Sequence, residues 1–179
     1  ERLKNEGINS PADLFISVDA GKLQKASELD LLQKISSDKI NSNISDDLKD
    51  INGFWVPITY RARILVYSKD RVNPEELSTY YSLTDDKWKN KILVRSSSNA
   101  YNQALLSSIV ANKGVESAAN WASSLVENFA REPKGNDRDQ VKAIAAGHGD
   151  IAIVNSYYIG LLLSSVNEEE LKAGKSVGV

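Results

Sequence analysis

The sequence has 179 residues, of which 41% are hydrophobic and 26% are charged, and its formal net charge is −2. This length allows one domain with a sizeable core or two small lobes, and the small net charge argues against nucleic acid or an anionic membrane as the main partner. The absence of cysteine excludes a disulfide scaffold, a zinc–thiolate site and a cysteine nucleophile. The single histidine, His148, excludes a metal site built from several imidazoles.

The first third of the chain predicts short elements joined by polar segments. Residues 1–6 are typical of the end of a helix that Gly7 closes. The apolar, β-branched run 13–18 predicts a buried strand, and apolar residues then recur at helical spacing over 23–32. Residues 36–53, rich in Ser, Asn, Asp and Lys, predict surface structure with one helical turn.

Residues 54–67 form a long strand-like stretch of apolar and aromatic residues. Its length predicts a strand that crosses between two lobes. We therefore expect residues 1–60 to form part of a first lobe with the crossing strand, and residues 61–179 to form a second lobe with the start of a return segment. The first four residues are typical of the middle of a helix and the last four of an incoming strand, so we expect a longer polypeptide.

The rest of the chain alternates between strand and helix patterns. Strands are predicted at 92–95 and 151–154, and helices after Asn99, over 115–129 and after Tyr157. A further helix is predicted to open with a capping box at residues 137–140 and to end at Gly147. This alternation predicts an α/β fold with a mostly parallel sheet.

Two turns that follow predicted strands carry candidate ligand-binding residues. The first, residues 95–103, contains Tyr101, and the second, residues 154–158, contains Tyr157 and Tyr158. Open α/β sheets bind ligands at the carboxyl ends of their strands, where helix N-termini favour anions. A phenol has a pKa of about 10, so a phenolate at neutral pH needs a strong local cation, and hard cations prefer oxygen donors. Three tyrosines on Fe³⁺ are chemically coherent; the alternative is packing with capping hydroxyls.

Segments along nearly the whole chain resemble, in colinear order, the ferric-binding subfamily of periplasmic solute-binding proteins. These segments are residues 10–13, 18–21, 58–67, 101–103, 136–140, 145–147 and 154–158. The most specific of them is the Tyr157–Tyr158 pair with Tyr101 upstream. The resemblance implies a two-lobed α/β fold of the periplasmic-binding-protein type, class II, of which this chain holds part of lobe one and most of lobe two.

The resemblance also implies roles for individual residues. Tyr101, Tyr157 and Tyr158 would be phenolate ligands of Fe³⁺, and Arg61 or Arg63 would hold a synergistic anion such as carbonate. Further candidates are the donors near that anion, Ser97, Ser98 and Asn99, and Asn155, which would orient the second turn. The alternatives are an ion-paired or solvated strand arginine and an ordinary polar turn. Many members add a His–Tyr pair near the mature N-terminus, which this chain does not include.

The implied function is that of a monomeric solute-binding protein of an ABC transporter, periplasmic or lipid-anchored outside the cell. It would capture ferric iron and deliver it to a membrane permease. Alternatives are the same fold binding another solute, a polyamine or an anion, or acting as a ligand-sensing domain. Tyrosines rather than clustered acids argue against a polyamine. No nucleophile–base pair or phosphate-binding glycine loop indicates an enzyme, and His148 is expected in a surface loop away from Tyr157.

Overall fold

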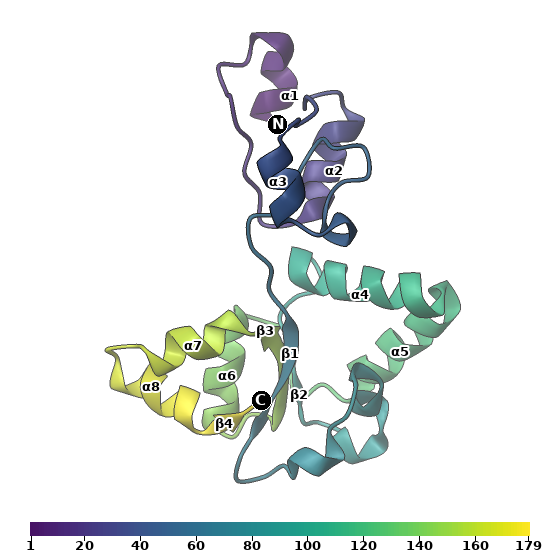
Figure 1. Ribbon diagram of the computed structural model, residues 1–179. Helices are drawn as coiled ribbons and strands as arrows, with labels where there is room; N and C mark the ends of the chain where they lie inside the picture. The colour runs from purple at the N-terminus through teal and green to yellow at the C-terminus, as the bar shows by residue number, and fades with distance from the viewer. The chain divides into compact units, whose positions relative to one another are not determined.

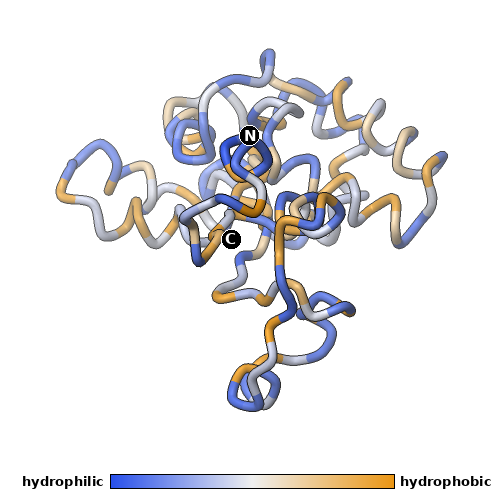
Figure 2. Tube along the Cα trace, turned by 90° about the horizontal axis from the view of Figure 1, so that it is seen from above, coloured by the Kyte–Doolittle hydropathy of each residue, from blue (hydrophilic) through white to orange (hydrophobic).

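The computed structural model describes residues 1–179. The chain folds into two compact units, Glu1–Tyr60 and Arg61–Val179 (Figure 1). No helix has the length and apolar character that a bilayer-spanning segment requires. Hydrophobic and hydrophilic residues are interleaved along the chain (Figure 2), and this pattern lets an amphipathic helix bury one face and expose the other.

The first unit is built from short helices. They are α1 (Arg2–Glu6), the 3₁₀ helix η1 (Gly7–Asn9), α2 (Ala20–Glu28), α3 (Asp38–Asn43) and the 3₁₀ helix η2 (Asp46–Leu48). Side-chain caps start the two longer ones: Asp19 accepts a hydrogen bond from the Lys22 amide at α2, and Ser37 accepts one from the Ile40 amide at α3. Asp19, which follows the predicted first strand, is therefore a helix cap.

Two predicted strands differ from the structure in this part of the chain. Residues 13–18 form no strand, and the side chains of Leu14 and Ile16 are 82% and 74% exposed. A strand needs a neighbour to complete its hydrogen-bond ladder, and Glu1–Tyr60 contains no strand to provide one. In the stretch 54–67, strand structure starts only at Arg63, after an exposed segment that includes Ile58 and Tyr60.

The second unit is a four-stranded sheet with helices on both faces. Its elements are β1 (Arg63–Ser68), η3 (Pro74–Glu76), η4 (Tyr80–Thr84), η5 (Asp86–Trp88), β2 (Ile92–Leu93), α4 (Ala100–Lys113), α5 (Val115–Glu127), α6 (Asp137–Ala145), β3 (Ile151–Asn155), α7 (Tyr157–Leu163), α8 (Glu168–Lys175) and β4 (Val177–Gly178). Helices α4 and α5 lie on one side of the sheet, and α6, α7 and α8 lie on the other (Figure 1). The α/β class predicted from the sequence is confirmed.

The sheet is not mostly parallel, contrary to the prediction from strand–helix alternation. The strand order is β2-β3-β1-β4, with β2 and β3 parallel and β1 antiparallel to both β3 and β4. The link between β1 and β2 contains only 3₁₀ helices. Because no α-helix returns the chain along a face of the sheet, β2 starts at the end where β1 stops. The strands β2 and β3, which precede the two tyrosine turns, do run in the same direction.

Alternate residues of the central strands fill a core on each face. Ile151 and Ile153 of β3 pack with Trp88, Trp121 and their neighbours on the α4–α5 side. Ala152 and Val154 pack on the α6–α7 side. All five residues of β3 are buried, so the strand that leads to the tyrosine pair is held rigidly between two apolar layers.

Candidate functional site

The three predicted tyrosines stand at the starts of two helices. Tyr101 lies in the first turn of α4, where the side chain of the N-cap residue Asn99 accepts a hydrogen bond from the Tyr101 amide at 2.9 Å. Tyr157 and Tyr158 are the first residues of α7, which is separated from β3 by Ser156 alone. Because β2 and β3 are parallel neighbours, the turns that follow them meet at the same edge of the sheet.

The side chains of these tyrosines come together. The ring centroids of Tyr157 and Tyr158 lie 4.3 Å apart with the planes tilted by 34°, and Tyr101 forms a side-chain hydrogen bond with Tyr157. The side chain of Tyr157 is 40% exposed, so solvent reaches the cluster. The structure thus brings into one site three residues that lie far apart in the sequence.

The hydrogen bond to Tyr157 and burial raise the pKa of the Tyr101 phenol above its usual value, while Arg61 and Arg95 oppose the rise. Tyr101 is therefore a neutral phenol at pH 7. To become a phenolate ligand it requires a stronger positive charge than the arginines provide, such as that of a metal ion. No group of three or more His, Cys, Asp or Glu residues is arranged to hold a metal elsewhere in the chain.

Three arginines surround the ring of Tyr101. The guanidinium carbons lie 4.5 Å from the ring centroid for Arg61, 5.3 Å for Arg95 and 6.0 Å for Arg63. These are cation–π distances, at which the positive charge is attracted to the ring face. Arg95, which is separated from β2 by Val94, was not among the predicted site residues.

A buried carboxylate, Asp137, holds two of these arginines. Its oxygens lie 2.6 Å from Nη1 of Arg63 and 3.3 Å from Nη1 of Arg95, and its side chain is fully buried. One oxygen also accepts a hydrogen bond from the Asn155 amide at 2.8 Å. Since one carboxylate faces two guanidinium groups, a positive charge is left beside Tyr101.

The start of α6 explains why Asp137 is available for this role. The predicted capping box was placed one residue too late: the N-cap is Asn136, and Asp139 accepts from the Asn136 amide at 2.7 Å to complete the box. Asp137 is therefore the first helical residue, and its side chain turns toward the sheet rather than capping the helix. Spacing in the sequence contains no signal for a carboxylate that is buried in this way.

Arg63 is occupied by protein partners. Besides Asp137, its Nη1 donates to Oδ1 of Asn155 at 3.2 Å, and its Nη2 donates to Oδ1 of Asn102 at 2.7 Å and to the Ile153 carbonyl at 2.9 Å. Burial lowers the pKa of Arg63, and the charge and hydrogen bond of Asp137 oppose that shift. Both Nη atoms therefore have acceptors within the protein.

The remaining predicted residues lie in and below the two turns. Ser97 and Ser98 are exposed, and the Oγ of Ser98 lies 2.8 Å from that of Ser96. Asn155 is fully buried at the end of β3. Three buried donors beneath the tyrosines have no acceptor: Nε of Arg63, Nε of Arg95 and Nδ2 of Asn155. Unpaired donors add to the positive character of this region.

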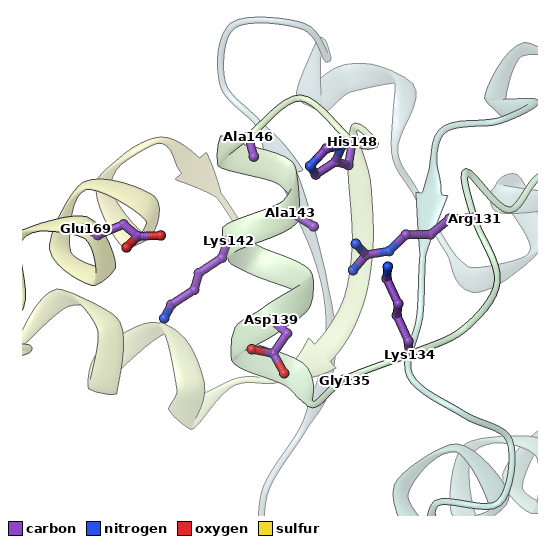
Figure 3. A pocket seen from close by; sticks show the side chains of 9 residues that line it. All are labelled: Arg131, Lys134, Gly135, Asp139, Lys142, Ala143, Ala146, His148 and Glu169. Atoms are coloured by element: carbon purple, nitrogen blue, oxygen red, sulfur yellow. The ribbon is translucent and has the colours of Figure 1, made fainter.

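A hollow of about 390 Å³ lies elsewhere on the same unit, along α6. It is lined by Arg131, Lys134, Gly135, Asp139, Lys142, Ala143, Ala146, His148 and Glu169. Arg131, Lys134 and His148 gather on one side of α6, and Lys142 and Glu169 lie on the other (Figure 3). His148 is exposed in the loop before β3, as expected, and no tyrosine lines the hollow. Its basic groups are partly balanced, because Lys142 pairs with Glu170 at 3.1 Å.

Comparison with known proteins identifies the family of this chain. Residues 9–167 match the family model of bacterial extracellular solute-binding proteins. The chain belongs to this family. This solute-binding protein is 45% identical over 179 residues to iron uptake protein A1 of Synechocystis, with 100% of the chain covered. The resemblance to iron-binding members noted in the sequence is thereby confirmed.

Solved structures share the fold of this solute-binding protein. A Trichodesmium protein (IdiA, FutA) in complex with iron and citrate ligands matches with a TM-score of 0.95 and 48% identity, covering 99% of this chain and 56% of that one. A ferric binding protein of Campylobacter jejuni matches with a TM-score of 0.92 and 41% identity, with the same coverage. The chain therefore has the fold of the periplasmic ferric-binding proteins, the class II two-lobed type.

The chain spans about half the length of the curated relatives it matches, 50% for iron uptake protein A1. The named relatives are iron-uptake and ferric-binding proteins rather than enzymes. The tyrosine hydroxyls of this chain are oxygen donors, the kind of ligand that hard cations prefer.

Proposed function

We propose that this chain forms part of a protein that captures ferric iron through tyrosine phenolates and delivers it to an ABC-transporter permease. The observation that carries the proposal is the convergence of Tyr101, Tyr157 and Tyr158 at two neighbouring helix N-termini. Phenolate oxygens are hard donors that suit Fe³⁺. The proposal is supported by 45% identity to an iron uptake protein and by the shared fold of an iron-bound protein.

In this proposal the two units have different roles. Glu1–Tyr60 forms part of the first lobe with the segment that crosses between lobes, and Arg61–Val179 forms the second lobe, which carries the tyrosines and the start of a return segment. Iron would bias the equilibrium between open and closed arrangements of the whole protein, and the permease would bind the closed one. The protein would act as a monomer in the periplasm or anchored by lipid outside the cell, without enzymatic activity.

A synergistic anion, carbonate in the simplest case, would bind iron together with the tyrosines, on the side where the protein offers positive charge and hydroxyl groups. Arg61 lies over the Tyr101 ring, and the exposed turn with Ser97 and Ser98 lies just before the same helix. Asn99 contributes by fixing that helix start, and Asn155 by accepting from Arg63 beneath it. These residues would place positive charge and hydroxyl donors beside the metal, which favours an anion.

The same arginines favour one alternative function, the binding of a small anionic solute without metal. Arg61, Arg63 and Arg95 all lie within 6.0 Å of the Tyr101 ring centroid. An anion would then be held by charge and hydrogen bonds alone, and the tyrosines would remain neutral phenols. Spectroscopy separates the two functions, because only iron ligation produces a phenolate-to-metal absorption band.

The proposal is tested by titrating the purified protein with ferric citrate in bicarbonate buffer and recording visible absorption. We expect a broad charge-transfer band that saturates at one iron per protein. Gallium(III), which has no such transition, serves as the control for absorption changes that do not arise from iron. Absence of the band, with citrate alone binding measurably, would replace the iron proposal with the anionic-solute function.

Iron binding is also expected to release protons and to weaken as the pH falls. The pKa of Tyr101 is raised, so its phenol holds a proton throughout the neutral range and must lose it to become a ligand. Metal affinity that requires deprotonation decreases toward low pH. With three tyrosine ligands we expect about three protons released per iron, beyond those of the chelator alone, measured with an indicator dye in weak buffer. Release equal to that of the chelator alone would contradict phenolate ligation.

A further inference from the structure

The contacts of Arg63 give it a different role from that of Arg61. Its guanidinium joins four elements of the second unit: β1 holds the residue itself, α6 provides Asp137, β3 provides Asn155 and the Ile153 carbonyl, and α4 provides Asn102. Four hydrogen bonds occupy both Nη atoms, and the side chain is only 9% exposed. Arg63 is therefore held in one position and has no terminal nitrogen left for a solute.

Asn102 connects Arg63 to the turn that carries Tyr101. Its Oδ1 accepts from Arg63 at 2.7 Å, and its Nδ2 donates to the carbonyls of Arg95 at 2.8 Å and Ser96 at 3.3 Å. It thereby connects the end of β2 to the first turn of α4. Tyr101 is the neighbouring residue in that turn, so the place of its ring depends on where Asn102 is fixed.

Asp137 connects Arg63 to the turn that carries Tyr157 and Tyr158. It contacts Arg63 and Arg95 and also accepts from the Asn155 amide, just before the Tyr157–Tyr158 pair. Charge-assisted hydrogen bonds of this kind are the strongest in a protein interior and have narrow geometric preferences. One buried ion pair thus connects both tyrosine turns.

We infer that Arg63 and Asp137 are positioning residues of the tyrosine site: together with Asn102 and Asn155 they hold the two turns in register, and Arg63 does not contact the anion. This inference rests on the proposed function for its effect on iron, but its structural part does not depend on the identity of the solute. Residues that orient metal ligands typically change affinity by about 10–100-fold when replaced.

The first test compares iron binding by the wild-type protein with Arg63→Lys, Asn102→Ala and the double variant. We expect each single variant to raise Kd about 10–100-fold and to shift the energy of the absorption band. The two effects should be less than additive, because both residues act through one contact. The loss in Arg63→Lys should be equal with and without bicarbonate. A loss seen only when bicarbonate is present would overturn the inference and make Arg63 an anion ligand.

Arg71→Lys is the matched control. Arg71 lies just after β1 and, like Arg63, makes several contacts, from its Nε to Asp150 at 2.6 Å and from its Nη2 to the carbonyls of Ile144 and Gly149. These contacts lie near the start of β3, away from the tyrosine turns. We expect Arg71→Lys to destabilise the protein without changing Kd or the absorption band. An equal effect on Kd would mean that general destabilisation explains the Arg63 result.

A second measurement separates this inference from the proposed function. In the metal-free protein, the Tyr101 ring resonances, assigned with Tyr101→Phe, should move in Arg63→Lys and in Asn102→Ala but not in Arg71→Lys. If wild-type protein gives no iron band while these shifts occur, the proposed function fails and the positioning role stands. If iron binds and the resonances, Kd and band are all unchanged in Arg63→Lys, the positioning role fails and the proposed function stands.

Discussion

Replacing Tyr157 with phenylalanine is expected to weaken ferric-iron binding by at least about 100-fold, since even residues that only orient ligands change affinity by about 10–100-fold. Tyr157 is the central member of the cluster, because its ring lies 4.3 Å from that of Tyr158 and its hydroxyl is hydrogen-bonded by Tyr101. Phenylalanine keeps the ring and removes only the oxygen. Kd is measured by competition against citrate, with the absorption band recorded in parallel.

Tyr81→Phe provides the matched control for this loss. Tyr81 lies in η4, is 38% exposed, close to the 40% of Tyr157, and stands outside the cluster. Its variant should bind iron like the wild type. Unchanged affinity in Tyr157→Phe would remove Tyr157 from the ligand set, whereas weakened binding with one proton fewer released per iron would identify the missing phenolate directly.

Replacing Asp137 with alanine is expected to lower the free energy of unfolding by about 3–5 kcal/mol, the usual cost of removing one partner from a buried ion pair. The reason is that Arg63, which is 9% exposed, and Arg95, which is 16% exposed, would keep their charges without the carboxylate that balances one of them. The Asn155 amide would also lose its acceptor. Urea unfolding followed by circular dichroism measures the change.

Asp139→Ala tests whether this cost is specific to the buried carboxylate. Asp139 lies two residues further along α6 and closes the capping box with Asn136. Loss of such a cap typically costs about 1 kcal/mol. If Asp137→Ala cost no more than Asp139→Ala, the ion pair beneath the tyrosines would contribute little to stability, and the loss would be that of a helix start alone.

The tyrosine turns could be predicted from sequence because local rules place them. Each follows a run of buried, β-branched residues and precedes a helix, and strand ends next to helix starts are where α/β folds bind ligands. The sequence does not show that β2 and β3 are neighbours in the sheet. These two strands are parallel, whereas β1 runs antiparallel to β3 and β4. The pairing depends on how the chain returns after β1, which involves residues far apart in sequence.

The roles of the two arginines Arg61 and Arg63 could not be told apart from the sequence. Arg61 and Arg63 lie on the same segment, two residues apart, and the sequence offered no means of separating them. Their surroundings in space differ: Arg63 faces Asp137 and Asn102, which lie 74 and 39 residues away along the chain. That Arg63 is fully occupied by protein acceptors depends on these long-range contacts.

The sequence by itself determined the α/β class and the helices that carry Tyr101 and Tyr157 in their first turns, and it predicts the tyrosine oxygens as donors for a hard cation. These features follow from local periodicity, caps and side-chain chemistry. Only the tertiary structure decided that the three tyrosines meet, that residues 13–18 form no strand, and that Asp137 is a buried counter-ion instead of a helix cap. Strand pairing, burial and ion pairing each depend on a partner distant in sequence, which no local pattern specifies.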